Sequence, residues 1–247
     1  MRLFGLIGYP LTHSFSKNYF TQKFSKEGIR DCSYENFQLA TIDNLPEIFH
    51  TNPSLEGLNV TIPYKESVLQ FLSDSNELVQ QTGACNCIKI INKKLLGYNT
   101  DVIGFERSLL DKLQPWHKKA LILGTGGAAK AVEFVFKKNN IHYKLVSRQS
   151  SGKNLLYDQL TPEIIKENTL IINTTPLGMY PDIDGLPSLP YEAVTPKHFL
   201  FDLIYNPEKT LFLAKGGERG ATIQNGYTML VYQAEESWKI WNTGNED

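Results

Sequence analysis

A glycine-rich segment of this chain has the residue types and spacing of a phosphate-binding turn. Residues 124–129 read Gly-Thr-Gly-Gly-Ala-Ala and match G-x-G-x-x-A, with the apolar run 120–123 before them and an amphipathic helical pattern after them. In such a turn Gly124 permits the tight bend, Gly126 lets the backbone approach a pyrophosphate, and Ala129 lets helix and strand pack closely. Glycine-rich turns also occur for purely structural reasons, but the strand before and the helix after favour nucleotide binding.

The next expected strand should end beside the ribose of the adenosine. NAD enzymes usually carry Asp or Glu there, whereas this chain has Ser147, Arg148 and, a little further on, Lys153. A guanidinium can form two parallel hydrogen bonds with a 2′-phosphate, and no carboxylate stands beside Arg148 in the sequence to repel that phosphate. Arg148 alone would be interpreted as a solvated loop cation; after the glycine turn it favours NADP.

Two hydroxyl groups separated by one residue, those of Ser14 and Ser16, follow the first expected strand. If the chain is locally extended, both hydroxyls point to one side, where they can bind a ligand. The alternative is that one of them caps the helix expected to follow, and taken alone this interpretation is favoured. The chain has no G-x-S-x-G motif, so a serine nucleophile is not expected.

Polar residues also gather at the end of an expected strand near residue 60. Alternation places Asn59 and Thr61 on one face, and Pro63 suits the start of a helix. Lys65 would then lie in the first helical turn, where a cation opposes the helix dipole. Because that position does not favour stability, Lys65 is a candidate functional residue, with an exposed surface lysine as the alternative.

Asn86 and Asp101 complete the polar candidates. Asn86 can equally be a satisfied turn residue, and Asp101 can simply cap the helix that follows it. A lysine and an aspartate at one pocket, such as Lys65 and Asp101, can form a proton-transfer pair. The carboxylate holds and tunes the ammonium, which gives or takes the proton of a substrate hydroxyl.

Composition excludes several classes of protein. The chain has 247 residues, a net charge of −1 and scattered basic residues, so we expect no binding to nucleic acid or to a membrane surface. No apolar run approaches the ~20 residues that cross a bilayer, and the apolar N-terminal stretch is too short for a signal sequence, so we expect a cytoplasmic protein. The three cysteines and five separated histidines have the spacing of neither a disulfide framework nor a metal site.

Alternating strands and helices must position these candidates. Periodicity predicts strands over 3–7, 33–39, 57–61, 85–91, 119–123, 142–147, 169–172 and 199–203. It predicts helices over 16–27, 44–49, 64–71, 77–81, 101–114, 127–139 and 227–241. This order indicates two α/β domains with a boundary near Ile103.

In order along the chain, these clusters resemble those of the shikimate dehydrogenase family. The first half of the resemblance is carried by Ser14-x-Ser16, Asn59-Val60-Thr61-x-Pro63-x-Lys65, Gly83-Ala84-x-Asn86 and Gly97-x-Asn99-Thr100-Asp101-x-x-Gly104. After the glycine turn and the Arg148 loop it continues in Asn173-Thr174-Thr175-Pro176-x-Gly178-Met179, Asp202-x-x-Tyr205-x-Pro207-x-x-Thr210 and Asn225-Gly226-x-x-Met229-Leu230-x-x-Gln233-Ala234. Nearly the whole chain is covered.

The resemblance implies an α/β fold of two domains, a substrate-binding domain (1–102 plus 227–247) and a Rossmann-type NADP-binding domain (103–226), with the C-terminal helix returning to the first. It implies Lys65 and Asp101 as the catalytic pair. The implied substrate ligands are Ser14, Ser16, Asn59, Thr61, Asn86, Asp101, Tyr205 and Gln233. The implied NADP-binding residues are Gly124, Thr125, Gly126, Gly127, Ala128, Ala129, Ser147, Arg148, Lys153, Thr174, Leu203, Gly226 and Met229.

The implied activity is the reversible, NADPH-dependent reduction of 3-dehydroshikimate to shikimate, on the pathway to chorismate and the aromatic amino acids, by a monomer or homodimer without a metal. One alternative is a quinate/shikimate dehydrogenase that uses NAD; the paired serines favour shikimate over quinate. The other is a non-catalytic metabolite- or cofactor-binding regulator, which would be expected to have lost Lys65 or Asp101. The chain departs from the family in reading Ser-Arg-Gln at 147–149, where Asn-Arg-Thr is commoner.

Overall fold

The computed structural model describes residues 1–11, 15–150 and 152–244, and the chain forms two compact units. Unit 1 comprises Met1–Thr100 and Ala234–Asp247, and unit 2 comprises Asp101–Gln233. The sequence-based division lay at 102/103 and 226/227. In the structure the chain passes between the units within helix α4 (Thr100–Leu110) and again within helix α8 (Tyr227–Asn242).

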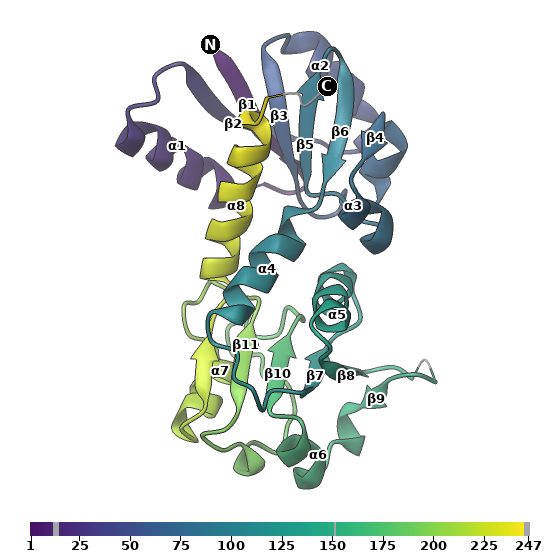
Figure 1. The fold of residues 1–247 in the computed structure, drawn as a ribbon, viewed down its shortest axis with the longest axis vertical. Helices are drawn as coiled ribbons and strands as arrows, with labels where there is room; N and C mark the ends of the chain where they lie inside the picture. The colour runs from purple at the N-terminus through teal and green to yellow at the C-terminus, as the bar shows by residue number, and fades with distance from the viewer. Residues whose placement is uncertain (12–14, 151, 245–247) are drawn as a thin grey trace. The chain divides into compact units, whose positions relative to one another are not determined.

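Unit 1 is built on one mixed sheet. Its strands are β1 (Arg2–Gly8), β2 (Cys32–Gln38), β3 (Leu55–Val60), β4 (Asp74–Ser75), β5 (Cys87–Ile91) and β6 (Lys94–Tyr98). Its helices, besides the end of α8, are α1 (Phe15–Glu27), α2 (Leu45–Thr51) and α3 (Glu77–Thr82). The strand order is β2-β1-β3-β5-β6-β4 (Figure 1), with β1 parallel to both neighbours and β5 antiparallel to β3 and β6.

The period of two in β1 divides the core of unit 1 between the two faces of the sheet. Phe4 and Leu6 pack in the cluster that contains Phe20 of α1 and Trp241 of α8. Ile7, one residue further on, packs in the cluster on the other face. The rings of Phe4 and Trp241 are stacked with centroids 4.8 Å apart, so aromatic contacts attach the C-terminal helix to this sheet.

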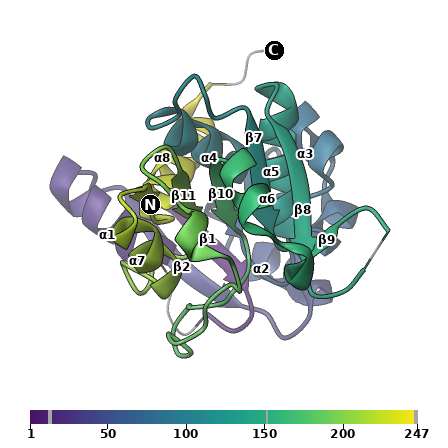
Figure 2. The ribbon, with the colours of Figure 1, turned by 90° about the horizontal axis from the view of Figure 1, so that it is seen from below.

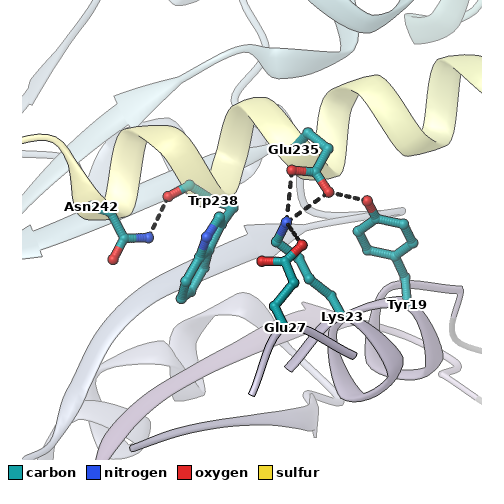
Figure 3. Close-up of polar contacts among 6 residues, drawn as sticks. All are labelled: Tyr19, Lys23, Glu27, Glu235, Trp238 and Asn242. Atoms are coloured by element: carbon teal, nitrogen blue, oxygen red, sulfur yellow. Dashed lines mark hydrogen bonds and ion pairs between the residues drawn. The ribbon is translucent and has the colours of Figure 1, made fainter. Parts of the chain in front are cut away.

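A charged cluster joins α1 to the part of α8 that belongs to unit 1 (Figure 3). The ammonium of Lys23 lies 2.8 Å from Glu27 Oε1 and 2.9 Å from Glu235 Oε2, and Tyr19 donates a short hydrogen bond to Glu235. The side chain of Lys23 is only 8% exposed. Its burial lowers the pKa of Lys23, but the hydrogen bonds to Glu27 and Glu235 outweigh this effect and raise the pKa overall.

We expect Glu235→Gln to lower the free energy of unfolding by about 1–2 kcal/mol, because it leaves the nearly buried ammonium with one carboxylate instead of two. The matched control is Glu35→Gln, which breaks an exposed pair with Lys17 at 2.7 Å and should cost less than about 0.5 kcal/mol. Urea unfolding of both variants measures the difference. Equal losses would show that burial of Lys23 adds nothing to the pair.

Unit 2 has a Rossmann sheet. Its strands are β7 (Lys119–Leu123), β8 (His142–Ser147), β9 (Leu155–Leu156), β10 (Leu170–Asn173), β11 (Phe199–Asp202) and β12 (Thr222–Gln224). Its helices, besides most of α4 and the start of α8, are α5 (Gly127–Lys138), α6 (Pro162–Glu167) and α7 (Leu211–Glu218). All neighbouring strands are parallel, and the order β12-β11-β10-β7-β8-β9 is doubly wound from the central β7, which confirms the predicted fold class. Figure 2 shows β11, β10, β7, β8 and β9 of this sheet.

Helices cover both faces of this sheet, so its central strands β7, β10 and β11 are almost entirely buried. Leu121 and Leu123 pack in a cluster with Ile165 of α6 and Phe212 of α7. On the other face Phe105 of α4 contacts both α5 and β11 through rings with centroids 5.3–6.2 Å from its own. The continuous apolar run that predicted β7 as a buried strand is explained by this arrangement.

Several elements differ from the sequence-based prediction. The helix predicted over 64–71 begins only at Ser67, as a 3₁₀ turn that ends at Phe71, because residues 62–66 form turns. The elements β4, β6, β9, β12, α6 and α7 were not predicted. Most of these span two to six residues, too few for a helical or strand period to stand out from the surrounding chain.

Candidate functional site

The predicted residues fall into two sets, one in each unit. In unit 2 the glycine turn leads directly from β7 into α5. Gly124 adopts φ 107°, a conformation that side chains other than glycine rarely adopt. A Cβ atom there would also lie 2.6 Å from the hydroxyl oxygen of Thr174, which donates a 2.7 Å hydrogen bond to the Leu123 carbonyl. Glycine at position 124 is therefore required both by the backbone and by the neighbouring loop.

The start of α5 is suited to an anion. Its N-cap is Gly126, which has no side chain to accept the first N–H groups of the helix. A Cβ atom on Gly126 would point into open space, with no atom within 4 Å, whereas Ala129 is 1% exposed and packs the helix onto the sheet. The structure thus provides what a pyrophosphate needs: exposed N–H donors at a helix N-terminus and room for the phosphates.

A pocket of about 400 Å³ adjoins this turn. It is lined by Gly124, Thr125, Gly126, Ser147, Arg148, Gln149, Tyr157, Thr174, Thr175, Pro176 and Leu177. Six predicted cofactor residues are therefore brought together. Gly127 and Ala128 are exposed in the first turn of α5, while Lys153 is exposed and not part of the lining. The lining fits a phosphorylated adenosine, since it contains a guanidinium and no carboxylate.

Ser147 serves the loop in this structure. Its hydroxyl donates to the Gln149 carbonyl at 2.5 Å and accepts a 2.7 Å hydrogen bond from Asn154 Nδ2. These bonds fix the turn that follows β8 and so the position from which Arg148 projects.

The residues predicted to border the nicotinamide lie near the ends of β11 and β12. The Gly226 N–H donates to the Ile204 carbonyl at 3.0 Å, and a Cβ atom on Gly226 would overlap the carbonyl group of Leu203. Met229 follows in the first turn of α8. Position 226 therefore requires glycine, because the Leu203 backbone approaches too closely for any side chain.

Asp202 links two loops beside these residues, a role that the motif alone did not suggest. Its buried carboxylate accepts hydrogen bonds from Asn173 Nδ2 at 3.0 Å, the Ile204 N–H at 3.1 Å and Thr210 Oγ1 at 2.6 Å. Asn173 Oδ1 in turn accepts a 2.7 Å hydrogen bond from the hydroxyl of Thr175, which lines the pocket. Burial raises the pKa of Asp202 to about 6, although these hydrogen bonds lower it in part.

This pKa predicts a pH dependence of stability. Because the folded-state pKa lies above the ordinary 3.8, the native state binds more protons than the unfolded state between about pH 4 and pH 6, and this group's contribution to stability decreases as the pH rises through that range. Asp202→Asn removes the contribution. Relative to wild type, the variant should therefore gain up to about 3 kcal/mol in unfolding free energy between about pH 4 and pH 7.5. Urea unfolding at both pH values tests this; a difference that does not change with pH would contradict it.

In unit 1 a buried hydrogen-bond network connects several predicted substrate ligands. Ser16 lies in the first turn of α1, not at its N-cap, and forms a hydrogen bond with the hydroxyl of Tyr34. The Tyr34 hydroxyl donates a 2.8 Å hydrogen bond to Asn59 Oδ1, and Asn59 Nδ2 donates a 3.0 Å hydrogen bond to Ser237 Oγ. Burial raises the pKa of Tyr34 well above its ordinary value, so the phenol stays neutral and can donate.

The network continues to the start of α4. The hydroxyl oxygens of Ser237 and Thr100 lie 3.2 Å apart. The side-chain amide of Asn86 forms two hydrogen bonds with Thr100: its Nδ2 donates to the Thr100 hydroxyl at 3.0 Å, and its Oδ1 accepts from the Thr100 N–H at 2.6 Å. Asn59 and Asn86 are each 3% exposed. Their amides thus fix neighbouring residues, and direct contact of either with substrate stays a prediction. Tyr34 and Ser237 were missed because neither lies in a motif.

Lys65 lies in a turn and not in a helix, so the helix-dipole argument made for it is wrong. The backbone carbonyl of Lys65 accepts a 2.8 Å hydrogen bond from the Cys85 N–H. The preceding Tyr64 is buried and donates 2.6 Å to the Leu39 carbonyl, while its N–H binds the Thr61 carbonyl at 3.0 Å. These bonds hold the half-buried Lys65 in a defined turn directly after β3.

The remaining candidates are placed as follows. Asp101 is the second residue of α4 and half-buried, so it lies in the first turn of that helix and is not its cap. Tyr205 is half-buried after β11, and burial raises its pKa. Gln233 is 5% exposed, and its Nε2 donates a 3.0 Å hydrogen bond to the Leu230 carbonyl. Ser14 lies outside the described residues.

The part of the chain that the structure describes contains neither a metal site nor a membrane-spanning helix. Across residues 1–11, 15–150 and 152–244, no three His, Cys, Asp or Glu side chains are grouped to hold a metal ion. Over the same ranges no helix is long and apolar enough to cross a membrane.

Comparison with known proteins agrees with these motifs. A profile of the "Shikimate dehydrogenase substrate binding domain" matches residues 6–88. A shikimate dehydrogenase (NADP(+)) of Methanococcus maripaludis is 37% identical over 263 residues, which cover 100% of this chain and 93% of the relative. The chain belongs to the shikimate dehydrogenase family. Another shikimate dehydrogenase (NADP(+)), of Desulforamulus reducens, is 33% identical over 96% of this chain and 88% of its own.

Solved structures of the shikimate dehydrogenase family share the fold. The shikimate 5-dehydrogenase of Thermus thermophilus, in complex with NADP(H) and shikimate, superposes with a TM-score of 0.86 at 28% identity, covering 100% of this chain and 95% of that one. A chorismate mutase/shikimate 5-dehydrogenase fusion from Clostridium acetobutylicum gives 0.86 at 35% identity, covering 100% and 93%. A quinate dehydrogenase of Corynebacterium glutamicum gives 0.87 at 24% identity, which shows a common fold only.

Proposed function

We propose that this protein is an NADP-dependent shikimate dehydrogenase that reversibly reduces 3-dehydroshikimate to shikimate, on the pathway to chorismate and the aromatic amino acids. The observation that carries the proposal is the 37% identity over the whole chain to an NADP(+) shikimate dehydrogenase. The pocket beside the glycine turn supports the choice of NADP, because its lining includes Arg148 and no carboxylate.

Lys65 and Asp101 are proposed as the catalytic pair. When bound, the nicotinamide of NADPH supplies the hydride for the ring carbonyl. Lys65 donates a proton to the oxygen as negative charge develops on it, and takes the proton back in the reverse direction. In this proposal Asp101 orients the ammonium for the transfer.

The other residues bind and orient the two ligands. We propose that Ser14 and Ser16 hold the carboxylate of the substrate, and that its ring hydroxyls are held by Asn59, Thr61, Asn86, Asp101, Tyr205 and Gln233. The phosphates and adenosine of NADP are assigned to Gly124, Thr125, Gly126, Gly127, Ala128, Ala129, Ser147, Arg148, Lys153 and Thr174, and the nicotinamide to Leu203, Gly226 and Met229. Orienting the carbonyl against the nicotinamide accounts for much of the expected rate enhancement. We further propose a cytoplasmic monomer or homodimer.

One experiment tests the function directly. Purified protein is incubated with shikimate or quinate and with NADP or NAD, in all four combinations, and reduced cofactor is followed by its absorbance. The proposal requires the highest kcat/KM for shikimate with NADP. Preference for quinate and NAD would replace it with the alternative dehydrogenase, and binding of the ligands without turnover would indicate a regulator.

A further inference from the structure

After β8 the chain forms a short polar loop and then the strand β9, which pairs with β8. Residues 148–154 connect β8 to β9, and their described part contains no helix. Asn154 folds this loop back through hydrogen bonds from Nδ2 to Ser147 Oγ at 2.7 Å and to the Gln149 carbonyl at 2.9 Å. As a result β9 pairs with β8 (Figure 2). Leu156 lies opposite Ser147, and Tyr157 is the next residue along the chain.

Tyr157 lines the same pocket as Arg148. Its side chain is half-buried against the core cluster of unit 2, and its hydroxyl oxygen is buried without a hydrogen-bond partner in the described part of the chain. A buried hydroxyl that lacks an acceptor destabilises a protein. Because Tyr157 lines the pocket, a ligand bound there can supply the missing acceptor.

Arg148 carries the same signal. Its guanidinium is exposed, forms no salt bridge with any residue that the structure describes, and shares the pocket with no carboxylate. The charge of Arg148 acts on the phenol of Tyr157 and lowers its pKa, but burial raises that pKa by more, so the phenol stays protonated. Among the described residues, a cation without a salt-bridge partner and a neutral donor without a hydrogen-bond acceptor thus line the same pocket.

We infer that Tyr157 is a specificity-determining residue of this enzyme: its hydroxyl donates a hydrogen bond to the 2′-phosphate of NADP that Arg148 also binds. This inference rests on the proposed use of NADP. The 2′-phosphate is favoured over the pyrophosphate because Tyr157 follows the residue paired with Ser147, at the strand end where the adenosine ribose lies, whereas the pyrophosphate lies at Gly126. The aromatic ring supplies the pocket wall, and the hydroxyl supplies the discrimination.

The test is Tyr157→Phe, which removes the hydroxyl and keeps the ring. Calorimetric titration with adenosine 2′,5′-bisphosphate and with 5′-AMP measures binding without catalysis. We expect the dissociation constant of the bisphosphate to rise about three- to tenfold and that of 5′-AMP to stay unchanged, as for the loss of one hydrogen bond to a phosphate. The melting temperature should not fall, because the variant loses no hydrogen bond within the protein.

The control is Tyr191→Phe, since the hydroxyl of Tyr191 donates 2.9 Å to the Pro187 carbonyl and the residue does not line this pocket. That variant should lower the melting temperature and leave both dissociation constants unchanged. For Tyr157→Phe, an unchanged bisphosphate affinity, or an equal loss for both nucleotides, overturns the inference. Failure of wild type to oxidise shikimate while it still discriminates the nucleotides would overturn the proposed function and leave this inference standing.

Discussion

Lys65→Ala should lower kcat by at least about 100-fold and leave KM for shikimate nearly unchanged. The variant removes the ammonium that we propose gives a proton to the oxygen during reduction and takes it back during oxidation. Binding of the ground state depends on the other ligands, so the loss falls on the chemical step. Steady-state kinetics in both directions measure kcat and KM separately.

Two further variants make this result specific. Lys65→Arg keeps the positive charge, but a guanidinium does not release its proton in proteins, so it should restore little of kcat. Lys94→Ala removes an exposed lysine at the start of β6 in the same unit and should change neither constant. If Lys65→Ala raises KM and preserves kcat, Lys65 binds substrate and the catalytic assignment is wrong.

Arg148→Ala should raise KM for NADP about ten- to a hundredfold and barely change KM for NAD. A guanidinium that binds a phosphate with two hydrogen bonds contributes roughly 1.5–3 kcal/mol, and only NADP carries the 2′-phosphate. The pocket supports this size of effect, because Arg148 is its cation and no carboxylate lines the wall. Kinetics with each cofactor at saturating shikimate measure the two values of KM.

Salt provides an independent check on the same contact. Added salt should weaken wild-type affinity for NADP more than that for NAD, because screening acts on the additional phosphate. Lys144→Ala, on the exposed side of β8, is the matched control and should affect neither cofactor. An equal loss for both cofactors in Arg148→Ala would mean that Arg148 stacks on the adenine or orders the loop.

The sequence predicted the local structure around the glycine turn in most of its detail. The signals there are local: a buried strand, a glycine turn and a helix follow one another within about twenty residues, and each has a distinct pattern. Gly124 and Ala129 then occupy the positions that the motif assigns to them. Arg148 could be predicted because it follows the next strand at a fixed distance from the turn.

Where the prediction failed, the local signal was ambiguous. Lys65 follows Pro63, and proline suits the first turn of a helix as well as a tight turn. Two tertiary contacts favour the turn over the helix: the burial of Tyr64, and the hydrogen bond from the Cys85 N–H to the Lys65 carbonyl. Asp101 was expected at an N-cap, but the helix begins one residue earlier, at Thr100, whose N–H and hydroxyl are bound by Asn86.

By itself, the sequence determined the family, the fold class, the cofactor and the candidate catalytic residues, since these depend on the order and type of residues in short motifs. Only the tertiary structure decided what holds those residues in place. Tyr34, Asp202 and Tyr157 lie on different strands and turns. Tyr34 and Asp202 matter through partners 8 to 29 residues away, and Tyr157 matters because its hydroxyl has no partner among the described residues. A hydrogen bond of this kind, or a donor left without one, depends on which buried groups the packed chain brings within about 3 Å, and no local pattern of residues encodes that.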